Sequence, residues 1–77
     1  MALTDDVKAL IELGIPGSEA EVLDEGGGDH LRAVVKAPQF EGLSRIEQHK
    51  LVKAAAKARF DDGSIHALSI RTIAGND

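Results

Sequence analysis

Residues 40–72 read FEGLSRIEQHKLVKAAAKARFDDGSIHALSIRT, and this stretch decides the fold that we predict. Ser44 and Glu47 have the spacing of a capping box, in which each side chain hydrogen-bonds the backbone of the other residue. Strong helix formers follow, and the turn at residues 61–63 ends them. The stretch therefore predicts one long helix, Ser44–Arg59. The apolar stripe expected along this helical segment consists of Ile46, Val52, Ala55, Ala56 and Phe60.

The residues after this helix alternate as in a β-strand. From Ser64 to Thr72, Leu68 and Ile70 share one face of the strand and form its large apolar side. His66 stands at the entry to the strand, where a side chain reaches the rim of a sheet. Residues 73–77 are expected to form a flexible tail.

The N-terminal half predicts a short helix followed by a hairpin. Residues 4–13 have an amphipathic pattern, with Thr4 as the N-cap, and Gly14 and Pro16 end the helix. Residues 18–25 and 30–37 alternate as two strands joined by a glycine-rich turn. The expected fold is α/β (α+β), in the order α-β-β-α-β. The last strand follows a helical crossover, so it can pair parallel to a strand of the hairpin through a right-handed connection. The chain then forms a single domain, residues 1–77, with a three-stranded mixed sheet and helices packed on one face.

Composition narrows the classes of function. The chain has 77 residues, no cysteine and a formal net charge of −4. The absence of cysteine excludes disulfides and protein thiolate ligands, and the negative charge disfavours non-specific binding of nucleic acid. No apolar run approaches the roughly 20 residues that span a bilayer, and the acidic start does not resemble a signal peptide. We therefore expect a cytoplasmic protein without membrane contact.

The three histidines are the residues best suited to site chemistry. His49 lies between Ile46 and Val52 on the predicted helix, and this spacing favours a partly buried structural role. His30 and His66 stand at the starts of predicted strands. No nucleophile, base and orienting group form a recognisable set, so we do not expect an enzyme.

Four short motifs resemble those of one family, the BolA-like proteins. They are Phe40-x-Gly42-x-Ser44, Gln48-His49-x-x-Val52, Ile65-His66-Ala67-Leu68-x-Ile70 and the loop Gly28-Asp29-His30. The resemblance implies a class II KH-like fold, which agrees with the element order above. Two departures are notable: Gln48 stands where the family often has arginine, and many relatives continue into a further helix after the last strand.

The resemblance implies a partner role in iron–sulfur trafficking or iron homeostasis. BolA-like proteins pair with a monothiol glutaredoxin, and the heterodimer shares a [2Fe–2S] cluster whose thiolates come from the glutaredoxin and glutathione. His66 is then one cluster ligand and His30 the best candidate for the second, with His49 as the alternative. No cofactor is expected in the isolated protein. The residues assigned to partner contact are Lys50, Lys53, Lys57 and Arg71. Histidine in place of cysteine is known chemistry for such clusters.

A DNA-binding transcriptional regulator is the alternative function. Some bacterial relatives are described in this way, and the Ser44–Arg59 helix would then contact DNA. The residues assigned to that contact are Arg45, Gln48, Lys50 and Lys53. A homodimer is the alternative to the glutaredoxin heterodimer.

Overall fold

The computed structural model describes residues 2–75 of the chain. The elements in order are α1 (Leu3–Gly14), β1 (Glu19–Gly26), β2 (His30–Ala37), the short 3₁₀ helix η1 (Pro38–Phe40), α2 (Arg45–Ala55), α3 (Lys57–Asp61) and β3 (Ala67–Ala74). The predicted order of helices and strands is confirmed, with two helices in place of the one long helix expected after residue 44. Among residues 2–75, no helix is long and apolar enough to cross a membrane.

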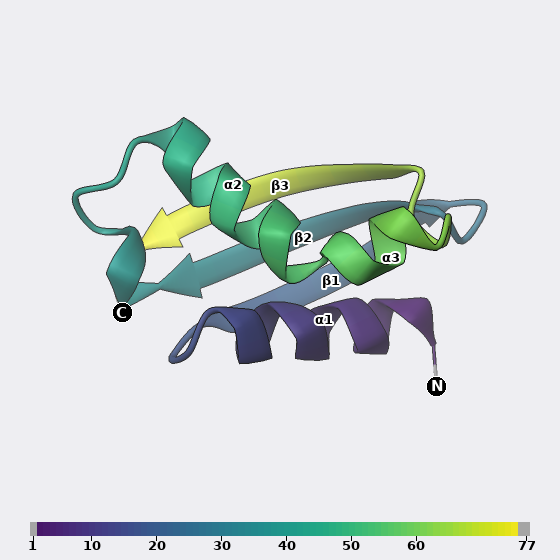
Figure 1. The fold of residues 1–77 in the computed structure, drawn as a ribbon, viewed down its shortest axis with the longest axis horizontal. Helices are drawn as coiled ribbons and strands as arrows, with labels where there is room; N and C mark the ends of the chain where they lie inside the picture. The colour runs from purple at the N-terminus through teal and green to yellow at the C-terminus, as the bar shows by residue number, and fades with distance from the viewer. Residues whose placement is uncertain (1, 76–77) are drawn as a thin grey trace.

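The three strands form one mixed sheet in the order β1-β2-β3 (Figure 1). β1 and β2 make an antiparallel hairpin with a bulge between Asp24 and Gly26. β3 returns after the helices and pairs parallel to β2, from His30 opposite Ala67 to Ala37 opposite Ala74. The mixed sheet predicted from the hairpin and the helical crossover is therefore confirmed.

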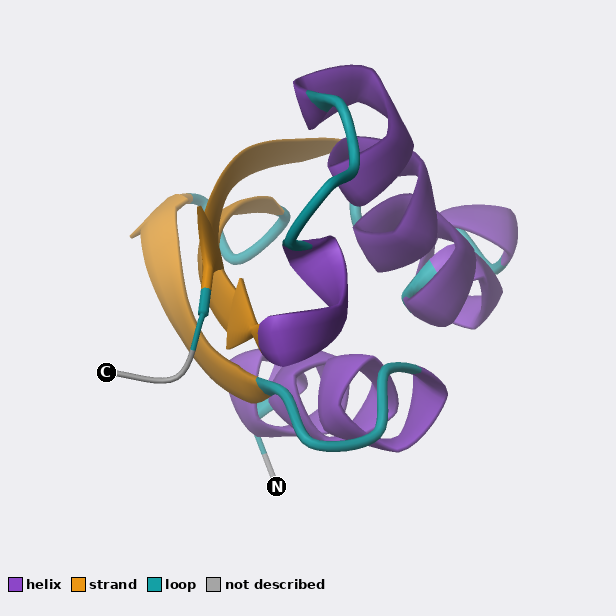
Figure 2. Cartoon of the chain, turned by 90° about the vertical axis from the view of Figure 1, so that its left-hand side faces the viewer, coloured by secondary structure: helices purple, strands orange, loops and turns teal. Residues whose placement is uncertain are grey.

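All helices cover the same face of the sheet, and the other face is open (Figure 2). β2 shows the alternation that creates this difference, because every second side chain on it is fully or almost fully buried under the helices. These residues are Leu31, Ala33, Val35 and Ala37. Phe40 is the largest fully buried side chain and fills the core beside them. The core is otherwise aliphatic, as the composition requires.

The capping box at the start of α2 is confirmed, but the predicted length of the helix is wrong. Glu47 N–H donates to Ser44 Oγ over 3.2 Å, and Ser44 N–H donates to Glu47 Oε1 over 3.0 Å. The helix stops at Ala56, whose φ of −93° and ψ of 7° break the α-helical path before α3 begins. Ala56 is fully buried, so packing at this point overrides the helix propensity of the surrounding residues.

The predicted apolar stripe is wrong at Ile46, which is 69% exposed. Val52 and Ala56, four residues apart, are the fully buried positions of this segment. Ile46 precedes Val52 by six residues, which is about 120° around a helix of roughly 3.6 residues per turn. Ile46 therefore lies on a different face from the buried pair.

α1 also differs from the prediction, at its start and in the role of its last residue. It begins at Leu3 after Ala2, without a side-chain cap, so Thr4 is not the N-cap. It ends at Gly14, as predicted, but this glycine has a packing role. A β-carbon built on Gly14 would lie 2.8 Å from the Ala55 Cβ atom, so α1 and α2 approach too closely there for a side chain.

β3 is shifted toward the C-terminus relative to the prediction. It begins at Ala67, because residues 62–64 form a turn in which Ser64 N–H donates to Asp62 Oδ1 over 2.8 Å. It continues through Ile73 and Ala74, which pair with Lys36 and Ala37. The flexible tail predicted from residue 73 is therefore wrong for these two residues, and residues 76–77 lie outside the described range.

Candidate metal and partner site

The parallel strands β2 and β3 start at the same end of the sheet and bring two histidines together. His30 is the first residue of β2 and pairs with Ala67, the first residue of β3, so His66 lies directly beside that pair. Both imidazoles are exposed: the His66 side chain is 70% accessible and the His30 side chain is 60% accessible. The hairpin turn and α3 lie at this same end of the molecule (Figure 1).

Asp29 connects the two histidines. Its backbone carbonyl accepts from the N–H groups of His66 and Ala67 over 2.9 and 3.3 Å, which continues the parallel ladder past the start of β2. Its carboxylate Oδ2 lies 2.5 Å from His66 Nδ1, and its Oδ1 lies 3.8 Å from His30 Nε2. One acidic residue thus contacts the backbone and side chain of His66 and approaches the side chain of His30.

The short contact with Asp29 determines which nitrogen of His66 is free. An ionised carboxylate only accepts hydrogen bonds, so His66 Nδ1 carries the proton and donates it to Asp29. In the neutral imidazole, Nε2 then keeps its lone pair and can bind a metal ion. The hydrogen bond from His66 lowers the pKa of Asp29 below its usual value, with a smaller electrostatic contribution from His30. A carboxylate on the far nitrogen is the usual support for a histidine ligand.

The site offers two nitrogen donors, which is an incomplete set for a metal ion. In the part of the chain that the structure describes, no group of three or more His, Cys, Asp or Glu side chains is arranged to hold a metal. Two histidines are also the number that ligates one iron of a Rieske-type [2Fe–2S] centre. The arrangement therefore suits co-ligation, in which another molecule supplies the remaining donors.

His49 lies away from this pair. It projects from α2 into a cleft that it shares with Ile70 of β3. Ile70 follows His66 by four residues, which corresponds to about 13 Å along a strand at roughly 3.3 Å per residue. Of the two candidates for the second ligand, the structure thus brings His30 to His66 and leaves His49 at a distance. His49 is partly buried, as its helical spacing predicts.

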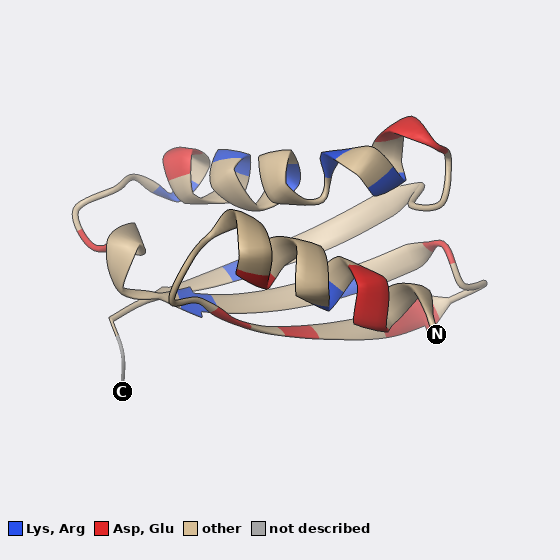
Figure 3. Ribbon diagram, turned by 60° about the horizontal axis from the view of Figure 1, so that its bottom comes forward, with Lys and Arg blue, Asp and Glu red and all other residues tan. Residues whose placement is uncertain are grey.

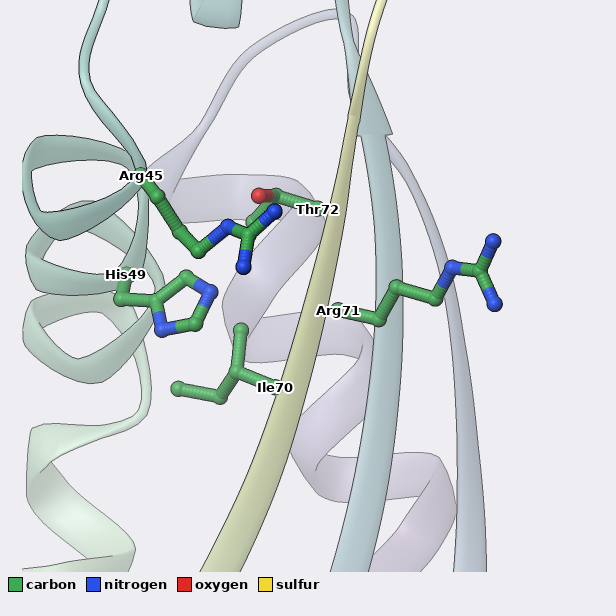
Figure 4. A pocket seen from close by; sticks show the side chains of 5 residues that line it. All are labelled: Arg45, His49, Ile70, Arg71 and Thr72. Atoms are coloured by element: carbon green, nitrogen blue, oxygen red, sulfur yellow. The ribbon is translucent and has the colours of Figure 1, made fainter.

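The residues assigned to partner contact lie on two different faces. Lys50, Lys53 and Lys57 are exposed on the helical layer, where basic residues recur along α2 and α3 (Figure 3). Lys57 is also held by Asp61, with 2.5 Å between Nζ and Oδ2. Arg71 projects from the opposite, uncovered side of the sheet (Figure 4). These four residues do not form one continuous surface.

Gln48 is engaged within the fold. Its Nε2 donates to the carbonyl oxygens of Phe40 and Leu43 over 3.0 and 3.1 Å, and its Oε1 accepts a short hydrogen bond from Thr72 Oγ1. Gln48 therefore anchors the loop before α2 to the helix, and the helix to β3. Reading a DNA base would require these bonds to break, so its position conflicts with the role assigned to it in the alternative function.

Asp29 is the one member of the site to which sequence reasoning assigned no role. It belongs to the loop motif beside His30, but the pattern gives no reason to connect it with His66, 37 residues later. The available signal was the predicted parallel pairing, which places the residues preceding two neighbouring strands side by side.

Comparisons with known proteins agree on one family. A family model for BolA-like proteins matches residues 16–77. The chain is 34% identical over 70 residues to an uncharacterized protein of Rickettsia prowazekii, covering 90% of each chain. Its structure resembles that of a BolA protein homologue from Coxiella burnetii, with a TM-score of 0.80, 39% identity and coverage of 96% of this chain and 92% of the other. It also resembles yeast Fra2, with a TM-score of 0.69, 25% identity and coverage of 95% and 80%.

Proposed function

Because the chain belongs to the BolA-like family, we propose that it is an adaptor that binds a monothiol glutaredoxin and co-ligates a [2Fe–2S] cluster bridging the two proteins. The observation that carries the proposal is the pair of exposed imidazoles, His66 and His30, at the heads of two parallel strands. The role is one of carrying and transferring a cluster rather than catalysis, in iron–sulfur trafficking or iron homeostasis.

The donor set fits a shared cluster better than a site within one chain. The chain contains no cysteine, so the thiolates must come from other molecules, here the glutaredoxin cysteine and glutathione. The cluster is the cargo of the assembly, and two imidazoles on one iron would raise its reduction potential relative to a four-thiolate cluster. His66 would bind through Nε2, the nitrogen left free by Asp29.

The surroundings of the histidines support docking of a second protein. Both side chains are largely exposed, so a partner can reach them without unfolding the domain. An apolar hollow of about 350 Å³ lies between α2 and α3 and is lined by Lys53, Ala54, Lys57 and Phe60. α3 and the start of β3 lie at the same end of the molecule (Figure 1), and we propose that the contact surface reaches this hollow on the helical layer.

The test is reconstitution of the cluster with and without this protein. A monothiol glutaredoxin, iron, sulfide and glutathione are mixed, the protein is added, and the visible absorption and circular dichroism spectra are recorded. We expect the spectra to change on addition of the protein and to keep the glutaredoxin-only form with His66→Ala. His30→Ala should weaken the change, and His49→Ala is the matched control that should leave it intact.

A second variant separates ligation from orientation. Asp29→Asn keeps both imidazoles but replaces the acceptor that holds His66 Nδ1–H, so the cluster should form with about 10- to 100-fold lower affinity. Wild-type protein that leaves the glutaredoxin spectra unchanged would refute the proposed function. A spectral change that survives His66→Ala would refute the assignment of the ligand.

A further inference from the structure

β3 is an edge strand with one side free. Within residues 2–75 the sheet ends at β3, whose eight residues pair there only with β2. Ala67 pairs with His30 and its N–H donates to the carbonyl oxygen of Asp29, the residue before His30, as a strand residue facing its parallel neighbour does. His66 N–H shares this acceptor but lies before the strand. From Ala67 on, every second residue of β3 directs its peptide groups toward β2. Leu68, Ile70 and Thr72 therefore direct their backbone N–H and C=O groups away from the sheet. They form a row of alternating donors and acceptors.

The two edges of the sheet differ in the features that prevent pairing. β1 has four acidic residues among its eight and a bulge near its end. β3 pairs with β2 in regular register, contains no proline and has one charged residue, Arg71. Charges and bulges are the usual protection of an exposed edge. β3 lacks most of this protection, so it is the edge on which another strand can pair.

A cationic cleft lies along the free edge of β3 (Figure 4). It has a volume of about 400 Å³ and is lined by Arg45, His49, Ile70, Arg71 and Thr72. Arg45 and His49 reach from α2 toward β3, whereas the Arg71 side chain points to the uncovered face of the sheet. No acidic residue lines the cleft, and within residues 2–75 no ion pair involves Arg45 or Arg71. The free edge therefore has positive charge on both sides.

We propose that the free edge of β3 binds an acidic, extended peptide segment of a partner protein as a fourth strand of the sheet. The backbone of that segment would pair with Leu68, Ile70 and Thr72. Its side chains would alternate between the two faces, so that acidic groups on one face meet Arg45 and His49 and those on the other meet Arg71. The proposal goes beyond cluster binding and does not depend on His66 or His30.

The backbone chemistry favours a peptide over a nucleic acid. A peptide strand presents N–H donors and C=O acceptors in alternation, which matches the free edge of β3. Phosphate groups only accept hydrogen bonds, so the phosphates of a nucleic acid would not pair with the carbonyl oxygens of Leu68, Ile70 and Thr72. The cationic side chains then select an acidic sequence among extended peptides.

The test uses an eight-residue peptide in which pairs of Glu alternate with pairs of Val, so that Glu side chains fall on both faces of the added strand. A matched peptide has Lys in place of Glu. We expect the acidic peptide to slow amide hydrogen exchange at Leu68, Ile70 and Thr72. Ser69 and Arg71 should change little, because their N–H groups already face β2. The lysine peptide should not bind.

Charge reversal on α2 tests the cleft. Arg45→Glu should weaken binding of the acidic peptide about fivefold, since it replaces one exposed attraction with a repulsion. Lys53→Glu makes the same change of charge on the same helix outside the cleft and is the matched control. Far-UV circular dichroism checks the folding of both variants, and Arg45→Gln provides a milder second variant.

Four results would overturn the proposal. Equal binding of the lysine peptide would remove the charge selection, and binding of the acidic peptide without protection at Leu68, Ile70 and Thr72 would remove the strand pairing. Protection of the same three amides by duplex DNA would make nucleic acid the ligand of the edge. Protection that appears with self-association, measured by sedimentation without any peptide, would make a second copy the occupant.

Discussion

Replacing Gly14 with alanine tests the close approach of α1 to α2. The added β-carbon would lie 2.8 Å from Ala55 Cβ and 3.3 Å from Ala55 Cα. Carbon atoms without a bond between them pack best at about 3.5–4.0 Å. The two helices must therefore separate by roughly 1 Å at their crossing, or the backbone must distort to keep them in place.

Two opposing effects determine the size of the change in stability. Overpacking of this kind costs about 1–3 kcal/mol in the free energy of unfolding. Gly14 is the last residue of α1, so alanine also gains helix propensity of up to about 1 kcal/mol. We expect Gly14→Ala to destabilise the domain by about 1–2 kcal/mol. In a domain of this size, each 1 kcal/mol corresponds to about 4–8 °C in the melting temperature.

A double-mutant cycle separates the two effects. Ala55→Gly removes the Cβ atom that the new methyl group meets, and by itself should cost about 1 kcal/mol in helix propensity. In the Ala55→Gly background, Gly14→Ala should cost less than about 0.5 kcal/mol or be stabilising. Urea denaturation of the four proteins, followed by far-UV circular dichroism, measures the coupling free energy, which we expect to exceed about 1 kcal/mol.

The cycle can contradict this reasoning in two ways. If Gly14→Ala keeps the wild-type midpoint and slope of denaturation, the helices do not pack as closely as described. If it destabilises equally in both backgrounds, the cost does not arise from contact with Ala55. In either case Gly14 would be a helix terminator only, as its position in the sequence first indicates.

Three further predictions concern stability. Hydrogen bonds from the hydroxyl and the N–H of Ser64, and from Arg59, lower the pKa of Asp62 to about 2. Because this folded-state pKa is depressed, the stabilisation that these bonds give is present above about pH 4 and is lost as the pH falls toward 2. The gap in melting temperature between wild type and Asp62→Asn should therefore close over that range, and a gap that stays constant would contradict the linkage. Gln48→Ala should lower the free energy of unfolding, measured by urea denaturation, by about 1–3 kcal/mol, because it leaves two backbone carbonyls and Thr72 without their partner. A change under about 0.5 kcal/mol would show that water replaces the Gln48 side chain. Phe40→Ala should lower the free energy of unfolding by about 3–5 kcal/mol in the same assay, because Phe40 is fully buried. Ile46→Ala, at an exposed position, should change it by no more than about 0.5 kcal/mol. Similar costs for the two variants would contradict the assigned core.

The parts of the fold that local chemistry controls were predictable. The capping box needs only two side chains and the backbone between them, so Ser44 and Glu47 place the start of α2. The strand β2 was predicted with its observed bounds, because period-two alternation and Pro38 both act locally. The parallel pairing of β3 followed from its helical connection to the hairpin.

Errors arose where distant segments compete with local preference. The break at Ala56 lies in a run of strong helix formers and is visible only once its burial is known. Ile46 was assigned to the core by its hydrophobicity, although the exposed side of the helix is decided by the position of the sheet. The end of β3 was placed too early because Ile73 and Ala74 are held by pairing with β2 rather than by their own sequence.

The candidate site shows the same difference between what local sequence and what tertiary packing determine. His66 and His30 could be selected from the sequence, because their motifs resemble those of a known family and histidine is the best metal-binding side chain in a chain without cysteine. Only the tertiary structure shows that Asp29 holds His66 Nδ1, that His30 lies beside it, and that His49 does not. The sequence by itself thus determined which imidazoles to consider. The parallel register of β2 and β3 decided which of them meet, since pairing between strands is set by the packing of the whole sheet.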